Sequence, residues 1–247
     1  NMTALVSLFA RAYHQKNKDI KIFDDLLSTK LITEKEYEMF GLNMSQGISF
    51  FNPTFKGSEE EALKWIVDHQ LSPSVLVRSA FCKEAIEDKR QRCKDVDIEN
   101  IQFLSIDLSQ ENWINTLLQG DYQEDQLSIS SMLGLSYYLT KDEFKKMLKQ
   151  LSKYLLKGSR LVFDYPSIQE SKETKINEML AKEADESMKA KYSFAELKEI
   201  LNQCHLTIIQ HENHQTVTEK YISNYNAYYK DDPIKAPEGV CYCVVEK

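Results

Sequence analysis

Three apolar, β-branched runs lie between residues 100 and 166, and helical patterns separate them. The runs read NIQFLSI, QLSISSM and SRLVFDYP. Each ends at a polar or small residue, and the intervening segments space their apolar residues as a helix does. This pattern predicts a βαβαβ unit with a parallel sheet, and therefore an α/β fold.

The carboxyl ends of the three predicted strands are the first place to look for chemistry. They fall at residues 106–108, 132–134 and 164–166, which read IDL, MLG and DYP. In an open parallel sheet, ligands bind beyond these ends. The pattern therefore places an acid, a turn glycine and an Asp-Tyr pair along one rim.

The first third of the chain shows helical patterns. Predicted helices span residues 3–15, 22–27, 33–40 and 58–69, with a loop at residues 41–57, and a further helix begins at Ser72 or Ser74 and ends at Ile86. Thr33 with Glu36 has the spacing of a capping box, and Ser58 can cap the fourth helix.

The last third combines helices with two strands. The pattern predicts a charged helical stretch at 169–191, helices at 194–204 and 217–229, and strands at 206–210 and 240–245. Ser193 is the expected cap of the helix at 194–204.

Composition narrows the class of protein. The 247 residues include 42% hydrophobic residues, which suits one α/β domain with an elaboration. The net charge of −7 lacks the basic excess of a nucleic-acid binder. No run is long enough to span a membrane and no signal peptide opens the chain, so we expect a cytoplasmic protein.

The five cysteines do not predict a metal site or disulfides. No CxxC spacing occurs among them. In the predicted strand 240–245, Cys241 and Cys243 point to one face, where buried thiols act as small hydrophobic groups.

The rim residues, together with TALVSLFARAYH at 3–14 and LSPSVLVRSAF at 71–81, resemble the class I S-adenosylmethionine-dependent methyltransferases of the leucine carboxyl methyltransferase type. The bacterial, polyketide O-methyltransferase-like branch is the more similar. The resemblance covers most of the chain. It implies a Rossmann-like sheet with helices on both faces, an N-terminal helical cap, and S-adenosylmethionine as cofactor.

One part of the family pattern is missing from this sequence. The glycine-rich turn and the two strands around it have no counterpart, since Gly57 and Gly120 bracket a glycine-free interval. A block of that kind has roughly 30 or more residues. Either the natural chain carries further residues between Ile86 and Gln91, or the block has been deleted. A deletion would leave the remaining strands without cover on a buried sheet, which favours the first interpretation.

This reading gives two segments. Residues 1–88 form the helical cap and lead into the core, and residues 89–247 form the methyltransferase core with a helical insertion at about 169–191.

The resemblance assigns the donor side to five residues. Arg78 takes the place of the family arginine that binds the donor carboxylate, a role that suits a guanidinium. Asp107 takes the place of the acid that accepts from the adenine amino group, and Leu108 offers its backbone N–H to the ring. Ser109 can cap the following helix, 110–118, which leaves Asp107 for the ligand. Met132 and Leu133 contribute backbone contacts, although Leu133 stands where the family often has an acid.

The acceptor side is less defined. His14, beside Arg11 and Tyr13, is a candidate base or substrate contact, and a solvent-facing histidine near a helix end is the alternative. Asp164 and Tyr165 are the preferred pocket pair at the rim. His205, His211 and His214 are expected away from it. No catalytic residue is assigned, because a carboxylate acceptor needs no general base, whereas a hydroxyl acceptor benefits from one.

Two functions remain. The first is transfer of a methyl group from S-adenosylmethionine to a hydroxyl or carboxylate oxygen of a small molecule. The alternative is an inactive scaffold of the same fold that binds a partner. The sequence points to no nucleic acid, membrane or metal, and leaves the oligomeric state open.

Overall fold

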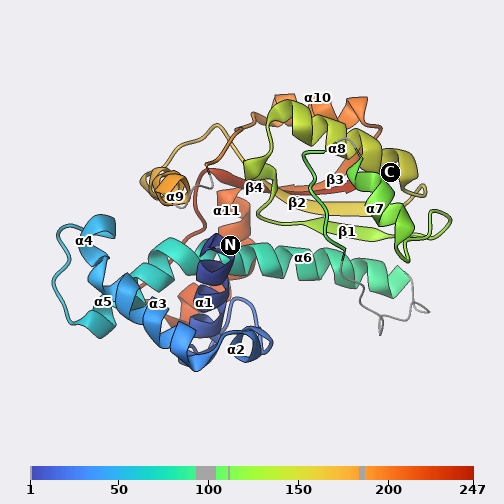
Figure 1. Ribbon diagram of the computed structural model, residues 1–247. Helices are drawn as coiled ribbons and strands as arrows, with labels where there is room; N and C mark the ends of the chain where they lie inside the picture. Colours follow the sequence, from blue (N-terminus) through green and yellow to red (C-terminus); the bar gives the residue numbers. More distant parts are fainter. Residues whose placement is uncertain (1, 93–103, 111, 184–186) are drawn as a thin grey trace. The chain divides into compact units, whose positions relative to one another are not determined.

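The computed structural model describes residues 2–92, 104–110, 112–183 and 187–247, and the chain divides into two compact units (Figure 1). Unit 1 comprises residues 1–81, 170–187 and 213–240, and unit 2 comprises residues 82–169, 188–212 and 241–247.

Unit 2 contains a four-stranded sheet with the strand order β1-β2-β4-β3. Its strands are β1 Ile129–Met132, β2 Arg160–Pro166, β3 Thr207–Glu212 and β4 Val240–Glu246. β1 and β2 run parallel with Met132 opposite Phe163, whereas β3 and β4 run antiparallel. The α/β prediction is confirmed, and both strands predicted in the last third of the chain are present as β3 and β4.

One face of this sheet carries the core of unit 2. Alternate side chains of β2 and β4 point into it, in the order Leu161, Phe163 and Tyr165, then Cys241, Cys243 and Val245. Helices α7 (Trp113–Gln119), α8 (Lys141–Tyr154) and α10 (Phe194–Gln203) contribute further buried side chains. Figure 1 shows α8 and α10 on this side of the sheet. The two cysteines are buried and free, as predicted.

Local capping fixes where the covering helices begin. Thr140 and Ser193 each accept a hydrogen bond from the backbone N–H three residues on, and Glu143 and Glu196 complete the capping boxes. Between β1 and α8 lies one short 3₁₀ turn, η2 (Ser136–Tyr138).

The first predicted strand falls partly on residues 100–103, which lie outside the described part of the chain, and residues 104–107 are described without strand pairing. Among the described residues, β1 is an edge strand of the sheet. The next helix also begins later than predicted, at Trp113.

Unit 1 is helical. It contains α1 (Met2–Asn17), α2 (Ser28–Leu31), α3 (Glu34–Gln46), α4 (Ile48–Phe51), α5 (Glu59–Trp65), η1 (Ile66–Leu71), α9 (Lys172–Glu183), α11 (His214–Val217), η3 (Thr218–Ile222) and α12 (Ser223–Tyr228). α6 (Ser72–Arg92) begins in this unit and continues into unit 2. The core of unit 1 gathers buried side chains of α1 around Phe9, together with Phe40, Phe51 and Ile66.

Two predictions for unit 1 are wrong. Residues 22–27 are not helical, because their backbone is held by side chains instead. Ile22 N–H donates to His14 Nε2, and Asp25 N–H donates to Gln15 Oε1. The predicted loop at 41–57 is helical in α3 and α4, since the capping box at Thr33 starts a helix that passes through Gly41.

Two π-helical segments interrupt the helices of unit 1. η1 joins α5 to α6 without a break, so the start predicted at Ser72 is not a helix end. η3 lies between α11 and α12 in the stretch predicted as one helix. A π-helical turn packs less well than an α-helical one and occurs often at functional sites.

Candidate functional site

The turn after β1 is fixed by the neighbouring strand β2. Gly134 has φ of +70°, a left-handed conformation that a glycine adopts without strain. Its backbone N–H donates to Asp164 Oδ1 at 2.6 Å. The Tyr137 hydroxyl donates to Asp164 Oδ2 at 3.0 Å, and the Ser136 hydroxyl donates to the Asp164 carbonyl at 2.6 Å. One residue of β2 therefore holds three residues of this turn.

Asp164 is completely buried, with 0% of its surface exposed. A buried carboxylate is costly unless donors satisfy its oxygens. Gly134 and Tyr137 supply one donor to each oxygen. Asp164 was predicted to line a substrate pocket together with Tyr165. In the structure it is a buried residue that binds the turn after β1.

Met132 and Leu133 lead into this turn. Met132 is 5% exposed and its side chain lies in the core of unit 2, while Leu133 is half-buried. The backbone of the pair is therefore the part best suited to contact a ligand. The backbone role expected for Met132 and Leu133 from the sequence stays a prediction.

Asp107 is exposed, and its carboxylate is engaged locally. Oδ1 accepts from both the backbone N–H and the hydroxyl of Ser109, and Oδ2 accepts from the Gln110 side chain. These hydrogen bonds lower the pKa of Asp107 below its ordinary value. Ser109 therefore binds Asp107 instead of capping the next helix, contrary to the sequence-based argument.

Leu108 follows Asp107 and packs its half-buried side chain against the core of unit 2. Nearby, Lys189 N–H donates to the Tyr137 carbonyl at 2.7 Å, and the Lys189 charge helps to lower the pKa of Asp107. The Asp107 carboxylate thus lies within electrostatic range of the residue that ties down the turn after β1.

Tyr165 points to the opposite face of β2 from Asp164. Its hydroxyl lies 2.8 Å from His211 Nε2, and its ring meets Phe163 and Tyr192. Burial lowers the pKa of His211. The prediction that placed His211 away from the rim residues is wrong, because β3 brings it to Tyr165. Tyr165 is 1% exposed, so it packs in the core.

Arg11 and Tyr13 occupy defined places in unit 1. Arg11 Nε donates to the buried Asp25 carboxylate at 2.6 Å, which joins α1 to the segment before α2. Tyr13 is 8% exposed and packs beside Phe9. Burial, reinforced by the charge of Asp68, raises the pKa of Tyr13 to about 12.

His14 is buried, with 1% exposed, so the solvent-facing alternative is wrong. Its Nε2 accepts from the Ile22 backbone N–H at 3.1 Å, and its ring stacks on Tyr225. A neutral histidine that accepts at Nε2 carries its proton on Nδ1. Nδ1 has no hydrogen-bond partner among the described residues. Burial lowers the pKa of His14 to about 4.

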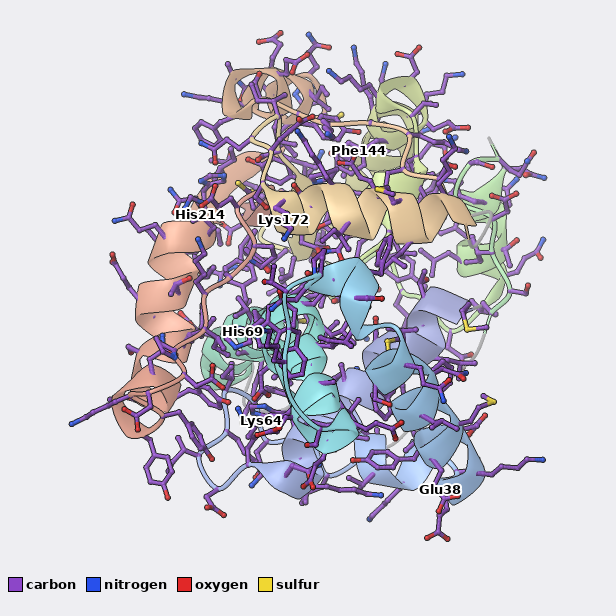
Figure 2. The ribbon with its side chains drawn as sticks, turned by 90° about the vertical axis from the view of Figure 1, so that its left-hand side faces the viewer. Glu38, Lys64, His69, Phe144, Lys172 and His214 are labelled. Atoms are coloured by element: carbon purple, nitrogen blue, oxygen red, sulfur yellow. The ribbon has the colours of Figure 1, made fainter. Side chains whose placement is uncertain are left out.

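A cluster of charged groups lies near His14 in unit 1. Asp68 Oδ2 is 2.5 Å from Lys18 Nζ and 3.1 Å from Lys64 Nζ. Lys64 also pairs with Asp232, which lies 2.8 Å from His69. Figure 2 shows Lys64 and His69 on successive turns of one helical stretch. Lys18 and Asp68 are buried, and Lys64 and Asp232 are exposed, so the cluster runs from the core to the surface.

Sequence reasoning missed this cluster. Asp68 and His69 lie on η1, and Asp232 follows α12, more than 160 positions away. The only signal in the sequence was polar residues within apolar helical stretches, which is typical of exposed faces as well.

Arg78 lies on α6 within unit 1 and is half-buried. The other residues assigned to the donor, namely Asp107, Leu108, Met132 and Leu133, lie in unit 2. The three acceptor-side residues of α1 belong to unit 1, whereas Asp164 and Tyr165 belong to unit 2. Within unit 2 the structure brings together the turn after β1 and Asp164.

The described ranges contain neither a candidate metal site nor a candidate membrane-spanning helix. No group of three or more His, Cys, Asp or Glu side chains is arranged to hold a metal ion there. Among the helices that the structure describes, none has the length and apolar character needed to cross a bilayer.

A parallel strand pair followed by a backbone-fixed turn is typical of α/β proteins, which bind ligands beyond the carboxyl ends of their parallel strands. The chain belongs to the leucine carboxyl methyltransferase family, whose model matches residues 4–96 and 86–152. It is a methyltransferase, and its methyl donor is S-adenosylmethionine. The predicted family, enzyme class and cofactor are confirmed.

A curated relative is similar along the whole chain. YktD of Bacillus subtilis (strain 168), named as an S-adenosyl-L-methionine-dependent methyltransferase, is 25% identical over 298 residues. The alignment covers 98% of this chain and 96% of the relative. Because the alignment is longer than the chain, part of YktD has no counterpart in this sequence.

Solved structures of similar fold include a DUF574 family protein from Streptomyces avermitilis, at 12% identity and a TM-score of 0.48, covering 98% of this chain and 97% of that protein. Another is the magnesium protoporphyrin IX methyltransferase of Synechocystis PCC 6803 with bound SAH, at 9% identity and a TM-score of 0.35, covering 100% of both chains.

Proposed function

We propose that this methyltransferase transfers the methyl group of S-adenosylmethionine to a carboxylate oxygen of a small molecule. The observation that carries the proposal is the state of His14. Its pKa of about 4 and its bond from Ile22 N–H to Nε2 make it a neutral hydrogen-bond donor through Nδ1. Such a group binds an oxygen and is a poor general base.

The choice of a carboxylate over a hydroxyl also rests on Asp164, the acidic residue of the predicted pocket pair, which is engaged elsewhere and does not serve as a base. Asp164 uses its two carboxylate oxygens to hold Gly134 and Tyr137. A carboxylate acceptor is already ionised at neutral pH and attacks without loss of a proton, whereas a hydroxyl must lose one. Arg11, Tyr13 and His14 remain the proposed acceptor-side residues, with the Nδ1–H of His14, which no described residue accepts, as the donor to the acceptor oxygen.

On the donor side, we propose that Arg78 binds the carboxylate of S-adenosylmethionine and that Asp107 accepts from the adenine amino group. The pKa of Asp107 is lowered by its bonds from Ser109, so it is ionised at neutral pH and suited to accept. Leu108, Met132 and Leu133 contribute their backbones. Alignment of donor and acceptor and exclusion of water are the main tasks of the protein in this displacement.

We also infer that the natural chain carries a donor-binding strand-turn-strand block between residues 86 and 91. Three observations support it. The two segments that match the family meet at residues 86–96. YktD contains residues without counterpart here. In the described residues β1 pairs on one side only, with β2, although parallel strands are normally covered on both sides. An intact mass several kilodaltons above 28.8 kDa would support this inference, and an equal mass would contradict it.

The acceptor class is tested with matched pairs of carboxylic acids and the corresponding alcohols or phenols. Release of S-adenosylhomocysteine is followed between pH 6 and 9. For a carboxylate acceptor we expect a rate that hardly changes across this range and a product methyl ester that base hydrolyses. A rate that rises with the ionisation of a hydroxyl, with an ether product, would contradict the carboxylate. The predicted cytoplasmic location remains a prediction.

A further inference from the structure

We infer that Asp164 is a positioning residue that presets the turn after β1 for the methyl donor. The inference rests on the proposed donor contacts of Met132 and Leu133. Asp164 itself touches neither donor nor acceptor in this proposal, and it acts through the backbone of the turn.

The first argument is the geometry of the turn. Asp164 Oδ1 receives the Gly134 N–H at 2.6 Å, and Gly134 is the residue with φ of +70°. A left-handed residue is the point at which the direction of the chain is set. The bond therefore fixes the conformation of the backbone that follows Met132 and Leu133.

Further hydrogen bonds, two of them to Asp164, fix the same turn. The Ser136 hydroxyl donates to the Asp164 carbonyl at 2.6 Å, and the Tyr137 hydroxyl donates to its side chain at 3.0 Å. Lys189 N–H donates to the Tyr137 carbonyl at 2.7 Å. A backbone held at so many points loses little entropy when a ligand binds to it.

The third argument is the burial of Asp164. A strand residue needed only for packing would be apolar, as Leu161, Val162 and Phe163 are. A carboxylate with 0% exposure is kept at a desolvation cost, and its two oxygens meet the donors of the turn. The chain thus places its acid on β2, behind the turn, where it shapes the backbone instead of contacting the ligand.

The test compares Asp164→Asn with Glu246→Gln. Both replace a carboxylate with an amide in the same sheet, and Glu246 Oε2 accepts from Arg160 Nε at 3.0 Å at the opposite end of β2. The dissociation constant of S-adenosylhomocysteine is measured by calorimetry on the natural protein, together with the thermal midpoint. We expect binding about tenfold weaker in Asp164→Asn and unchanged in Glu246→Gln.

Tyr137→Phe removes the phenol donor and leaves the Gly134 bond. We expect a smaller loss of affinity than in Asp164→Asn, and a double variant close to Asp164→Asn alone, because both changes act on one carboxylate. Once an acceptor is known, Asp164→Asn is expected to raise the donor KM more than it lowers kcat. The inference would be overturned if the variants had lower thermal midpoints but the same affinity for S-adenosylhomocysteine as the wild type. Absence of binding by the wild type would overturn the proposed function as well.

Discussion

Lys18 Nζ lies 2.5 Å from Asp68 Oδ2, and both side chains are buried, with 4% and 2% exposed. The pair joins the segment after α1 to the π-helical segment η1, 50 positions further along the chain. It is therefore a tertiary contact that helical propensity alone cannot supply. Lys18 also lies over the rings of Tyr225 and Tyr229.

Removal of one partner of this pair leaves a buried charge without compensation. We expect Asp68→Ala to lower the free energy of unfolding by about 3–5 kcal/mol. Urea denaturation followed by circular dichroism measures the change. The matched control is Lys175→Ala, which breaks the exposed pair with Glu170 and is expected to cost about 1 kcal/mol or less. Equal losses in the two variants would contradict the account.

The stability of the protein is expected to depend on pH through His14. Its pKa is about 4 in the folded protein and 6.5 in the unfolded chain. Between these values the unfolded chain binds the additional proton, so stability falls as the pH drops from about 6.5 to 4. The full effect is about 3 kcal/mol. Below pH 4 both states are protonated and this loss levels off.

The measurement is the urea midpoint of wild type and His14→Gln at several values between pH 4 and 7. The difference between the two proteins isolates His14, because the carboxylates titrate in both. We expect the urea midpoint of His14→Gln to change less steeply with pH than that of the wild type. Parallel curves would show that His14 titrates alike in the folded and unfolded states.

Arg78→Ala is expected to weaken donor binding by about 1.5–3 kcal/mol, the range for a hydrogen bond to a charged group. That corresponds to roughly tenfold or more in the dissociation constant of S-adenosylhomocysteine. Arg78→Lys keeps the charge and loses the forked geometry, so we expect an intermediate affinity. Unchanged affinity in Arg78→Ala would remove this residue from the donor site.

Gly134→Ala and Gly158→Ala form a matched pair. Both glycines have positive φ, +70° and +92°, so a Cβ strains the backbone at each. We expect a loss of about 1–2 kcal/mol in the free energy of unfolding in each variant. Only Gly134 lies in the turn held by Asp164, so only its variant is expected to lose affinity for S-adenosylhomocysteine. Equal affinity in both would contradict the role of the turn.

Most elements of the fold could be predicted from local signals. The capping boxes at Thr33, Ser58, Thr140 and Ser193 are present, and each starts a predicted helix. The strands β1 to β4 were predicted from their apolar runs. The helix predicted at residues 22–27 was wrong because side chains of α1 accept hydrogen bonds from the backbone of this segment. No local sequence pattern reveals such tertiary contacts.

The candidate site was predictable in part. The rim residues around Gly134 and Asp164 do meet, since β1 and β2 are parallel neighbours. The alternation of a strand separates Asp164 from Tyr165, so the predicted pair does not share a pocket face. The contacts of Asp68 and of His211 depend on the packing of distant segments, and the sequence holds no local trace of them.

The π-helical segment η1 has a consequence for how relatives of this chain are aligned. A π turn holds one residue more than an α-helical turn would in its place, as an inserted residue does. Loss of one residue from 66–71 would restore a regular α-helical turn, and the helices on either side would keep nearly the same phase, because the wider π turn already absorbs the extra residue. A gap placed here in a comparison of sequences therefore marks an insertion that is absorbed within one turn, and the buried faces of α5 and α6 still correspond on both sides of it.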